Sequence, residues 1–93
     1  MPATIQVEKI GEGSFRVVVQ EGGRQTSHVV SLEDGYWRRL TGGKVGAEEL
    51  VRRSFEFLLE REPKESILRK FDLPVIGRYF PEYEGEIKKR LGG

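Results

Sequence analysis

Two glycine clusters divide the first third of the chain into three short segments in which apolar and polar residues alternate. The clusters are Gly11-Glu12-Gly13 and Gly22-Gly23. Alternation with period two is typical of strands that bury one face, and glycine accepts the positive φ that tight hairpin turns require. The pattern therefore predicts a three-stranded antiparallel meander over residues 1–32.

Both turns independently predict the same inward face for this meander. The first hairpin is expected to pair Ile10 with Ser14, Val7 with Val17 and Ile5 with Val19, and the second to pair Glu21 with Arg24, Val19 with Thr26, Val17 with His28 and Phe15 with Val30. The residues expected on the inward face are Ile5, Val7, Phe15, Val17, Val19, His28, Val30 and Leu32.

The remaining residues, 33–93, are expected to be helical. Helices are predicted at 33–40, at 47–60, at 64–70 after Pro63, over a turn or two at 72–80 with Asp72 as the cap, and at 81–91. These bounds rest on acidic first turns, on prolines in first turns and on glycines that end helices. In the longest helix, 47–60, apolar residues cover about half of the circumference at roughly 100° per residue. One face of a sheet cannot cover that much apolar helix surface alone. The helix therefore needs a second packing partner, which is either the C-terminal segment or another copy of the chain.

The expected fold is a single α+β domain of 93 residues, a length that suits one hydrophobic core. It consists of a three-stranded antiparallel β-meander, residues 1–32, packed on the long amphipathic helix 47–60. Short C-terminal helices follow, so that the last thirty residues of the helical part, 33–93, wrap the far side of that helix.

The charges of the chain are balanced, with sixteen basic and fifteen acidic residues and a formal net charge of +1. Such a chain has no overall field that draws it to nucleic acid or anionic lipid. It contains no cysteine and no long apolar run, which argues against disulfides, thiol chemistry and a membrane helix. We expect a cytoplasmic protein without a membrane partner. Ten of the basic residues are Arg and Asn is absent, which favours a thermophilic source; a GC-rich mesophilic source is the alternative, because it would also favour Arg.

Residue types that carry catalysis are scarce. The single histidine, His28, falls on the inward face, where we expect a partly buried ring rather than a general base. One His without Cys does not make a metal site, and serine chemistry needs an oriented base. Glu82, Glu84 and Glu86 are expected to be a surface cluster, because position 84 lies on another side of a helix. The sequence therefore predicts no catalytic residue, no metal site and no cofactor, and we expect that the protein is not an enzyme.

The stretch Ile10-Gly11-Glu12-Gly13-Ser14-Phe15-Arg16-Val17 resembles the glycine-rich phosphate loop of protein kinases. Arg16 stands where that loop has its third glycine, and no kinase catalytic motif follows. The glycines are therefore expected to form a hairpin and not a phosphate site.

The segment from Val29-Val30-Ser31-Leu32 through Val45-Gly46-Ala47-Glu48-Glu49-Leu50-Val51 resembles ribbon-helix-helix repressors and antitoxin-type α/β domains. That resemblance implies strand side chains in the DNA major groove and a phosphate at a helix N-terminus. The DNA contacts it implies are Arg24, Gln25, Ser27, Gly46 and Ala47. The pattern departs from the family because Arg24 is the only basic residue at the outward positions of the reading strand, Glu48 and Glu49 crowd the phosphate position, and the strand already has a hairpin partner in its own chain.

The C-terminal half is also similar to a family of small conserved bacterial proteins of unassigned function. The similarity rests on Ser54-Phe55-Glu56-Phe57-Leu58-Leu59-Glu60-Arg61-Glu62-Pro63, Phe71-Asp72-Leu73-Pro74-Val75-Ile76 and Tyr79-Phe80-Pro81-Glu82-Tyr83. It implies a self-contained domain without a named activity. We expect a non-catalytic protein-interaction module that binds itself as a homodimer, or another protein, through an uncovered sheet edge or the surplus helix face. The alternative is a small DNA-binding transcriptional regulator or antitoxin-like protein.

Overall fold

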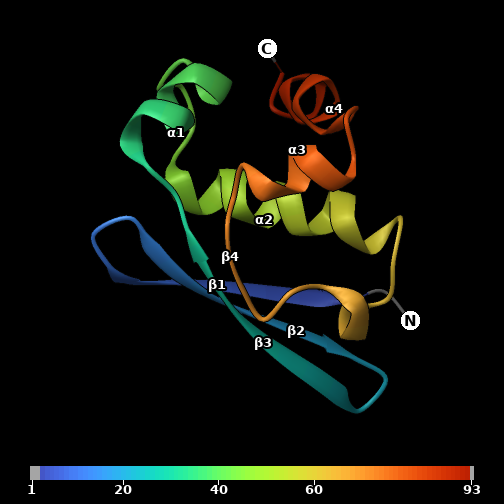
Figure 1. The fold of residues 1–93 in the computed structure, drawn as a ribbon. Helices are drawn as coiled ribbons and strands as arrows, with labels where there is room; N and C mark the ends of the chain where they lie inside the picture. The colour runs from blue at the N-terminus through green and yellow to red at the C-terminus, as the bar shows by residue number, and fades with distance from the viewer. Residues whose placement is uncertain (1–2, 93) are drawn as a thin grey trace.

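The computed structural model describes residues 3–92 and arranges them as one sheet with helices on one of its faces (Figure 1). The elements in chain order are β1 (Thr4–Gly11), β2 (Ser14–Glu21), β3 (Arg24–Ser31), α1 (Asp34–Thr41), α2 (Ala47–Leu59), the 3-10 turn η1 (Lys64–Ser66), β4 (Lys70–Asp72), α3 (Val75–Tyr79) and α4 (Tyr83–Arg90). The strand order is β1-β2-β3-β4. Within the described part of the chain no helix lies on the opposite face of the sheet, so residues 3–92 form two layers (Figure 1).

The meander forms with the predicted register in both hairpins, with Val7 opposite Val17 and Val17 opposite His28. Gly22 and Gly23 both have positive φ, as the predicted two-residue turn requires. The expected pairing of Ile10 with Ser14 is wrong, because the register shifts after Lys9 and Gly11 faces Ser14 instead. Ile10 is the extra residue of this bulge and its side chain is exposed.

Gly13 is the turn residue that the fold constrains most tightly. Its φ is +64°, and a Cβ built there would lie 2.9 Å from the carbonyl oxygen of Leu32. The approach is close because the Leu32 amide donates to the Gly13 carbonyl oxygen at 2.8 Å. A side chain at position 13 would therefore be strained by both the backbone and the neighbour.

The inward face predicted from the turns is the buried face of the sheet. Its buried residues are Ile5, Phe15, Val17, Val19, Thr26, His28, Val30 and Leu32, and Val7 is half-buried. Thr26 is the one member of this face that the prediction left out. Its hydroxyl is satisfied by the His28 ring 2.8 Å away, so a polar residue is accommodated there.

The sheet is four-stranded and mixed, so the prediction of a three-stranded antiparallel meander is incomplete. β4 runs parallel to β3 and sets Phe71 beside Val30. The helix expected at 64–70 is only the turn η1, and Asp72 lies in β4 rather than capping a helix. Backbone bonding explains the difference: the Val29 amide donates to Arg69 O at 2.8 Å and the Leu73 amide to Ser31 O at 2.9 Å. These bonds satisfy the groups of β3 that the meander leaves unpaired.

Within residues 3–92, four helices accompany the sheet, α1 and α3–α4 besides the long helix α2. The predictions at 33–40 and 47–60 correspond to α1 and α2, while the regions predicted at 72–80 and 81–91 contain the shorter α3 and α4. The second apolar side of α2 is covered by the C-terminal segment: Tyr83 and Ile87 are fully buried there. The Tyr83 hydroxyl lies 2.6 Å from the Ser54 hydroxyl of α2. The surplus helix face is therefore not free to bind another copy.

Within residues 3–92, no helix has both the length and the apolar character needed to span a membrane.

Candidate functional site

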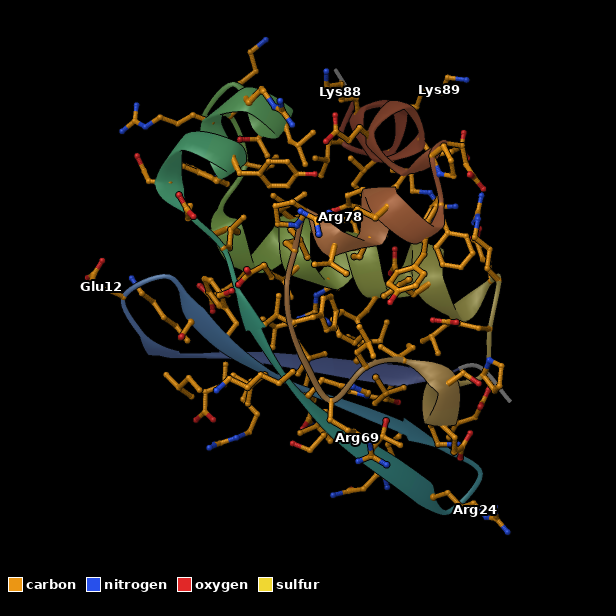
Figure 2. The ribbon with its side chains drawn as sticks, in the orientation of Figure 1. Glu12, Arg24, Arg69, Arg78, Lys88 and Lys89 are labelled. Atoms are coloured by element: carbon orange, nitrogen blue, oxygen red, sulfur yellow. The ribbon has the colours of Figure 1, made fainter. Side chains whose placement is uncertain are left out.

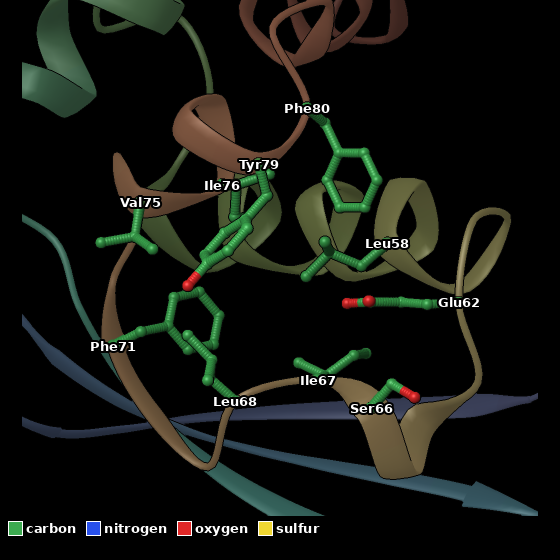
Figure 3. A pocket seen from close by; sticks show the side chains of 10 residues that line it. All are labelled: Leu58, Glu62, Ser66, Ile67, Leu68, Phe71, Val75, Ile76, Tyr79 and Phe80. Carbon is green, nitrogen blue, oxygen red and sulfur yellow. The ribbon is translucent and has the colours of Figure 1, made fainter.

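An apolar pocket lies between the C-terminal end of α2, the segment η1–β4 and α3 (Figure 3). Its volume is about 380 Å³. It is lined by Leu58, Glu62, Ser66, Ile67, Leu68, Phe71, Val75, Ile76, Tyr79 and Phe80. All of these residues come from one stretch of the chain, 58–80, so local folding of this stretch builds the pocket.

The sequence explains how this stretch folds back on itself. The Glu62 amide donates to Leu58 O at 2.9 Å in the last turn after α2, and Pro63, which cannot continue a helix, then begins η1. Lys64 is buried, with its Nζ 3.0 Å from Glu65 and 3.8 Å from Glu21 of β2. This charge pairing fixes η1 against the β2–β3 turn. The chain then has only a few residues in which to reach the edge of β3.

The floor of the pocket belongs to the core, whereas its mouth is exposed. Leu58, Ile67 and Ile76 are buried. At the mouth, Leu68 is 46% exposed and Tyr79 is 66% exposed. Large apolar side chains exposed side by side at a concave site are typical of binding surfaces.

Among the described residues, Glu62 is the only one that contributes a carboxylate to the lining of this pocket. Its carboxylate points into the hollow from the side opposite Phe71 (Figure 3). It has no hydrogen-bond or ion-pair partner in the part of the chain that the structure describes, and burial raises the pKa of its carboxyl group. A negative charge that is partly removed from water and unpaired is costly, and a cation that enters the pocket would relieve that cost.

His28 is buried behind this site and is hydrogen-bonded to it through Leu68. Its Nδ1 is 2.7 Å from Leu68 O, which only accepts, so Nδ1 carries a proton. Nε2 then accepts from the Thr26 hydroxyl at 2.8 Å in the neutral ring. Burial and the charge of Arg69 lower the pKa of His28, while the bond to Leu68 opposes them. The ring also packs on Phe55 at 5.3 Å. The ring was expected to be partly buried, and the structure buries it almost completely; both of its bonds join it to neighbouring protein groups.

The five residues implied as DNA contacts fall into two groups. Arg24, Gln25 and Ser27 are exposed on β3, beginning at the β2–β3 turn. Gly46 and Ala47 begin α2 in the helical layer, where Ala47 borders a hollow shared with Glu12. Figure 2 shows Glu12 and Arg24 at opposite ends of the sheet. The structure thus does not bring the two groups together.

The acidic cluster near the C-terminus is divided among different arginines. Glu82 pairs with Arg61 at 3.0 Å, and Glu84 pairs with Arg39 at 2.9 Å. Glu86 lies 4.0 Å from Arg90. Across residues 3–92, no group of three or more His, Cys, Asp or Glu side chains is arranged to hold a metal ion.

The stretch that resembles a kinase phosphate loop forms the predicted β1–β2 hairpin. Arg16 pairs across the strands with Glu8 at 3.1 Å on the open face of the sheet. Its charge is therefore engaged within the hairpin.

The pocket at Glu62 was not predicted from the sequence. The pattern predicts short helices for Leu68 and Tyr79 and leaves Phe71 between them, and Glu62 follows the run Glu60-Arg61, which is typical of a solvated surface. The one feature of the sequence that could indicate this pocket is the high density of aromatic residues between 71 and 83. These residues are more numerous than the core can bury.

No family model matches this chain, and no curated protein or solved structure is significantly similar to it. Its function must therefore be inferred from its own geometry.

Proposed function

We propose that this chain is a non-catalytic protein-interaction module whose pocket at the end of α2 binds a lysine or arginine side chain of a partner protein. The observation that carries the proposal is the unpaired Glu62 carboxylate in an apolar hollow with Leu68 and Tyr79 exposed at its mouth. Among the described residues, the only other titratable group in the lining is the Tyr79 phenol, which lies at the exposed mouth, and no His, Cys, Lys or second carboxylate lines the pocket to form an acid–base pair with Glu62.

The chemistry of the pocket favours a long cationic side chain over other ligands. Lys and Arg bury an apolar stem while the charged end seeks a polar partner. The stem would contact Leu58, Ile76 and Phe80, and the charged end would reach Glu62. An uncharged apolar side chain would fill the same space but remove more water from the carboxylate without pairing it. An acidic side chain would add repulsion.

The experiment is an NMR titration of the ¹⁵N-labelled protein with N-acetyl-lysine methylamide and with the uncharged N-acetyl-norleucine methylamide. The lysine derivative is expected to shift amide signals of residues 58–80 and to bind about tenfold more tightly than the norleucine derivative, the factor that one charge-assisted hydrogen bond provides. Glu62→Gln should abolish this preference. Glu12→Gln, which removes a carboxylate from the distant β1–β2 turn, should retain it.

Equal affinity of the wild-type protein for the two derivatives would contradict the proposal. So would chemical-shift changes that lie outside residues 58–80.

A DNA-binding regulator is the second candidate, and the observation that favours it is the exposure of Arg24, Gln25 and Ser27 along one strand. The near-zero net charge argues against it. Fluorescence anisotropy with a labelled DNA duplex tests it: binding that weakens with salt and is reduced in Arg24→Ala, but not in Lys88→Ala, would support this function. Binding that responds equally to both substitutions would indicate a non-specific charge effect instead.

A further inference from the structure

β4 is an edge strand whose outer backbone groups are free. The bonds to β3 use Arg69 O and the Leu73 amide, and in a parallel ladder every second residue faces the neighbour. Phe71 therefore faces β3, while the N–H and C=O groups of Lys70 and Asp72 point away from it. Among residues 3–92 these outward groups have no hydrogen-bond partner. They can pair with an added strand.

The opposite edge of the sheet, β1, is less suited to pairing. Nη1 of Arg52 in α2 donates to the carbonyl oxygen of Ile5, which occupies one of its backbone acceptors. The bulge at Ile10 and the exposed charges of Glu8 and Lys9 interrupt the same strand. Bulges and charges of this kind are features that keep natural edge strands from pairing.

The side chains of β4 are complementary to those of a second β4 in the antiparallel direction. If Phe71 faces Phe71 of a second copy across a two-fold axis, Lys70 of each chain faces Asp72 of the other. Lys70 and Asp72 are exposed and lie on the same face of the sheet, beside Val29 and Ser31. The free backbone groups belong to these same two residues, so both Lys–Asp pairs coincide with hydrogen-bonded pairs of the ladder.

The apolar surface around β4 is consistent with this register. Extending the pairing places the exposed Leu68 of one chain opposite Pro74 of the second copy and next to Val75. A second hollow of about 350 Å³ on the β3 side of β4 shares Leu68, Phe71 and Val75 with the Glu62 pocket. Concave apolar surface therefore flanks the edge, and a second copy paired with β4 would cover the hollow on the β3 side, which Glu62 does not line.

We infer that the chain forms a homodimer by antiparallel pairing of β4 with β4 of a second copy, which joins the two sheets into one of eight strands. Two-fold symmetry closes this assembly, because each copy uses its single β4. Phe71 and Glu62 lie on opposite sides of the pocket (Figure 3), so the added strand lies on the side away from Glu62. The inference does not depend on the ligand of Glu62 and is tested separately from it.

The test uses charge reversal at the paired positions and sedimentation velocity over a range of concentrations. The wild-type protein is expected to sediment as a dimer of about 21 kDa, twice the chain mass of 10.6 kDa. Lys70→Asp alone sets Asp against Asp in both pairs, and Asp72→Lys alone sets Lys against Lys. Each variant is expected to weaken the dimer at least about tenfold, because two attractive cross-strand pairs become repulsive.

Mixing the two variants restores opposite charges only between unlike chains. The mixture is therefore expected to form a heterodimer with about the wild-type dissociation constant. Lys9→Asp, a matched charge reversal on β1, should leave the wild-type dimer unchanged. Far-UV circular dichroism of each variant establishes that it is folded.

Three results would overturn the inference: a wild-type protein that stays monomeric at millimolar concentration, a dimer unaffected by either reversal, or variants that fail to associate when mixed. None of these results bears on the preference of Glu62 for lysine, so failure of the dimer and failure of the proposed function are distinguishable.

Discussion

The buried hydrogen bond between α2 and α4 offers a sharp test of how the helical layer is held together. The Ser54 hydroxyl donates to Leu50 O at 2.7 Å, so the Tyr83 hydroxyl is the donor of the 2.6 Å bond that joins the two side chains. Both residues are fully buried, and burial raises the pKa of the Tyr83 hydroxyl, which stays protonated. The Tyr83 hydroxyl has no other hydrogen-bond partner among the described residues.

The two single substitutions are expected to differ in cost. Ser54→Ala leaves the Tyr83 hydroxyl buried without an acceptor, which costs about 2 kcal/mol, and the higher helix propensity of Ala returns about 0.5 kcal/mol. The net loss of about 1.5 kcal/mol corresponds to a fall in Tm of about 6–12 °C for a domain of this size. Tyr83→Phe removes the donor itself, and Ser54 keeps its bond to Leu50, so the loss is about 1 kcal/mol.

The double variant Ser54→Ala/Tyr83→Phe gives the decisive measurement. It lacks both hydroxyl groups, so neither position has an unpaired polar group. Its free energy of unfolding is expected to lie within about 0.5 kcal/mol of the wild-type value. Adding Tyr83→Phe to Ser54→Ala should therefore increase stability. Urea titrations of the four proteins, followed by far-UV circular dichroism, measure all four free energies. If the second substitution lowered the stability of Ser54→Ala further, the reasoning from the unpaired hydroxyl would be refuted.

Three other predictions concern the sheet. Val17→Asp places an unpaired charge on the buried face of the sheet and should unfold the domain. Val18→Asp, on the other face, should lower the free energy of unfolding by only about 1 kcal/mol. Equal circular dichroism spectra of the two variants would show that the faces are misassigned. Gly13→Ala should cost at least about 1 kcal/mol more than Gly22→Ala, because only the first new Cβ meets a backbone carbonyl; equal losses in urea titrations would argue against that contact. Folding lowers the pKa of His28 below its ordinary value of 6.5. The contribution of the neutral ring to the free energy of unfolding is therefore fully present above about pH 6.5. It falls by up to about 1.4 kcal/mol per pH unit as the pH drops toward the folded-state pKa. His28→Gln should flatten that part of the pH profile, and an unchanged slope would exclude the ring as its source.

The meander could be predicted because its information is local. Each turn is specified by adjacent glycines, and each strand has a period-two pattern that fixes its buried face, so the two hairpins agree on Val17 without any knowledge of the helices. The one error in the predicted register, at Ile10, is a bulge. A bulge changes the register by a single residue while leaving the alternation on either side intact, so hydrophobic pattern does not reveal it.

β4 and the pocket could not be predicted because their causes are distant in sequence. Three residues are too few to show a period, and Lys70–Asp72 becomes a strand only because β3 presents unpaired backbone groups forty residues earlier. Glu62 likewise resembles any surface carboxylate until the chain returns to set Phe71 and Tyr79 around it. The conclusion that α2 needs a second cover was derivable from the sequence, but the choice between the C-terminal segment and another copy required the fold.

His28 connects the core of the sheet to both proposed binding surfaces. Its Nδ1–H holds the carbonyl of Leu68, and the Leu68 side chain borders both hollows that flank β4. A three-residue strand has few backbone bonds of its own, so loss of this anchor should loosen residues 67–72 before it affects the meander. His28→Gln is therefore expected to weaken both lysine binding and dimer formation. Glu62→Gln should affect the first alone and Lys70→Asp the second alone. If His28→Gln lowered overall stability but left both binding constants unchanged, β4 would be positioned by its ladder with β3 and not by the histidine.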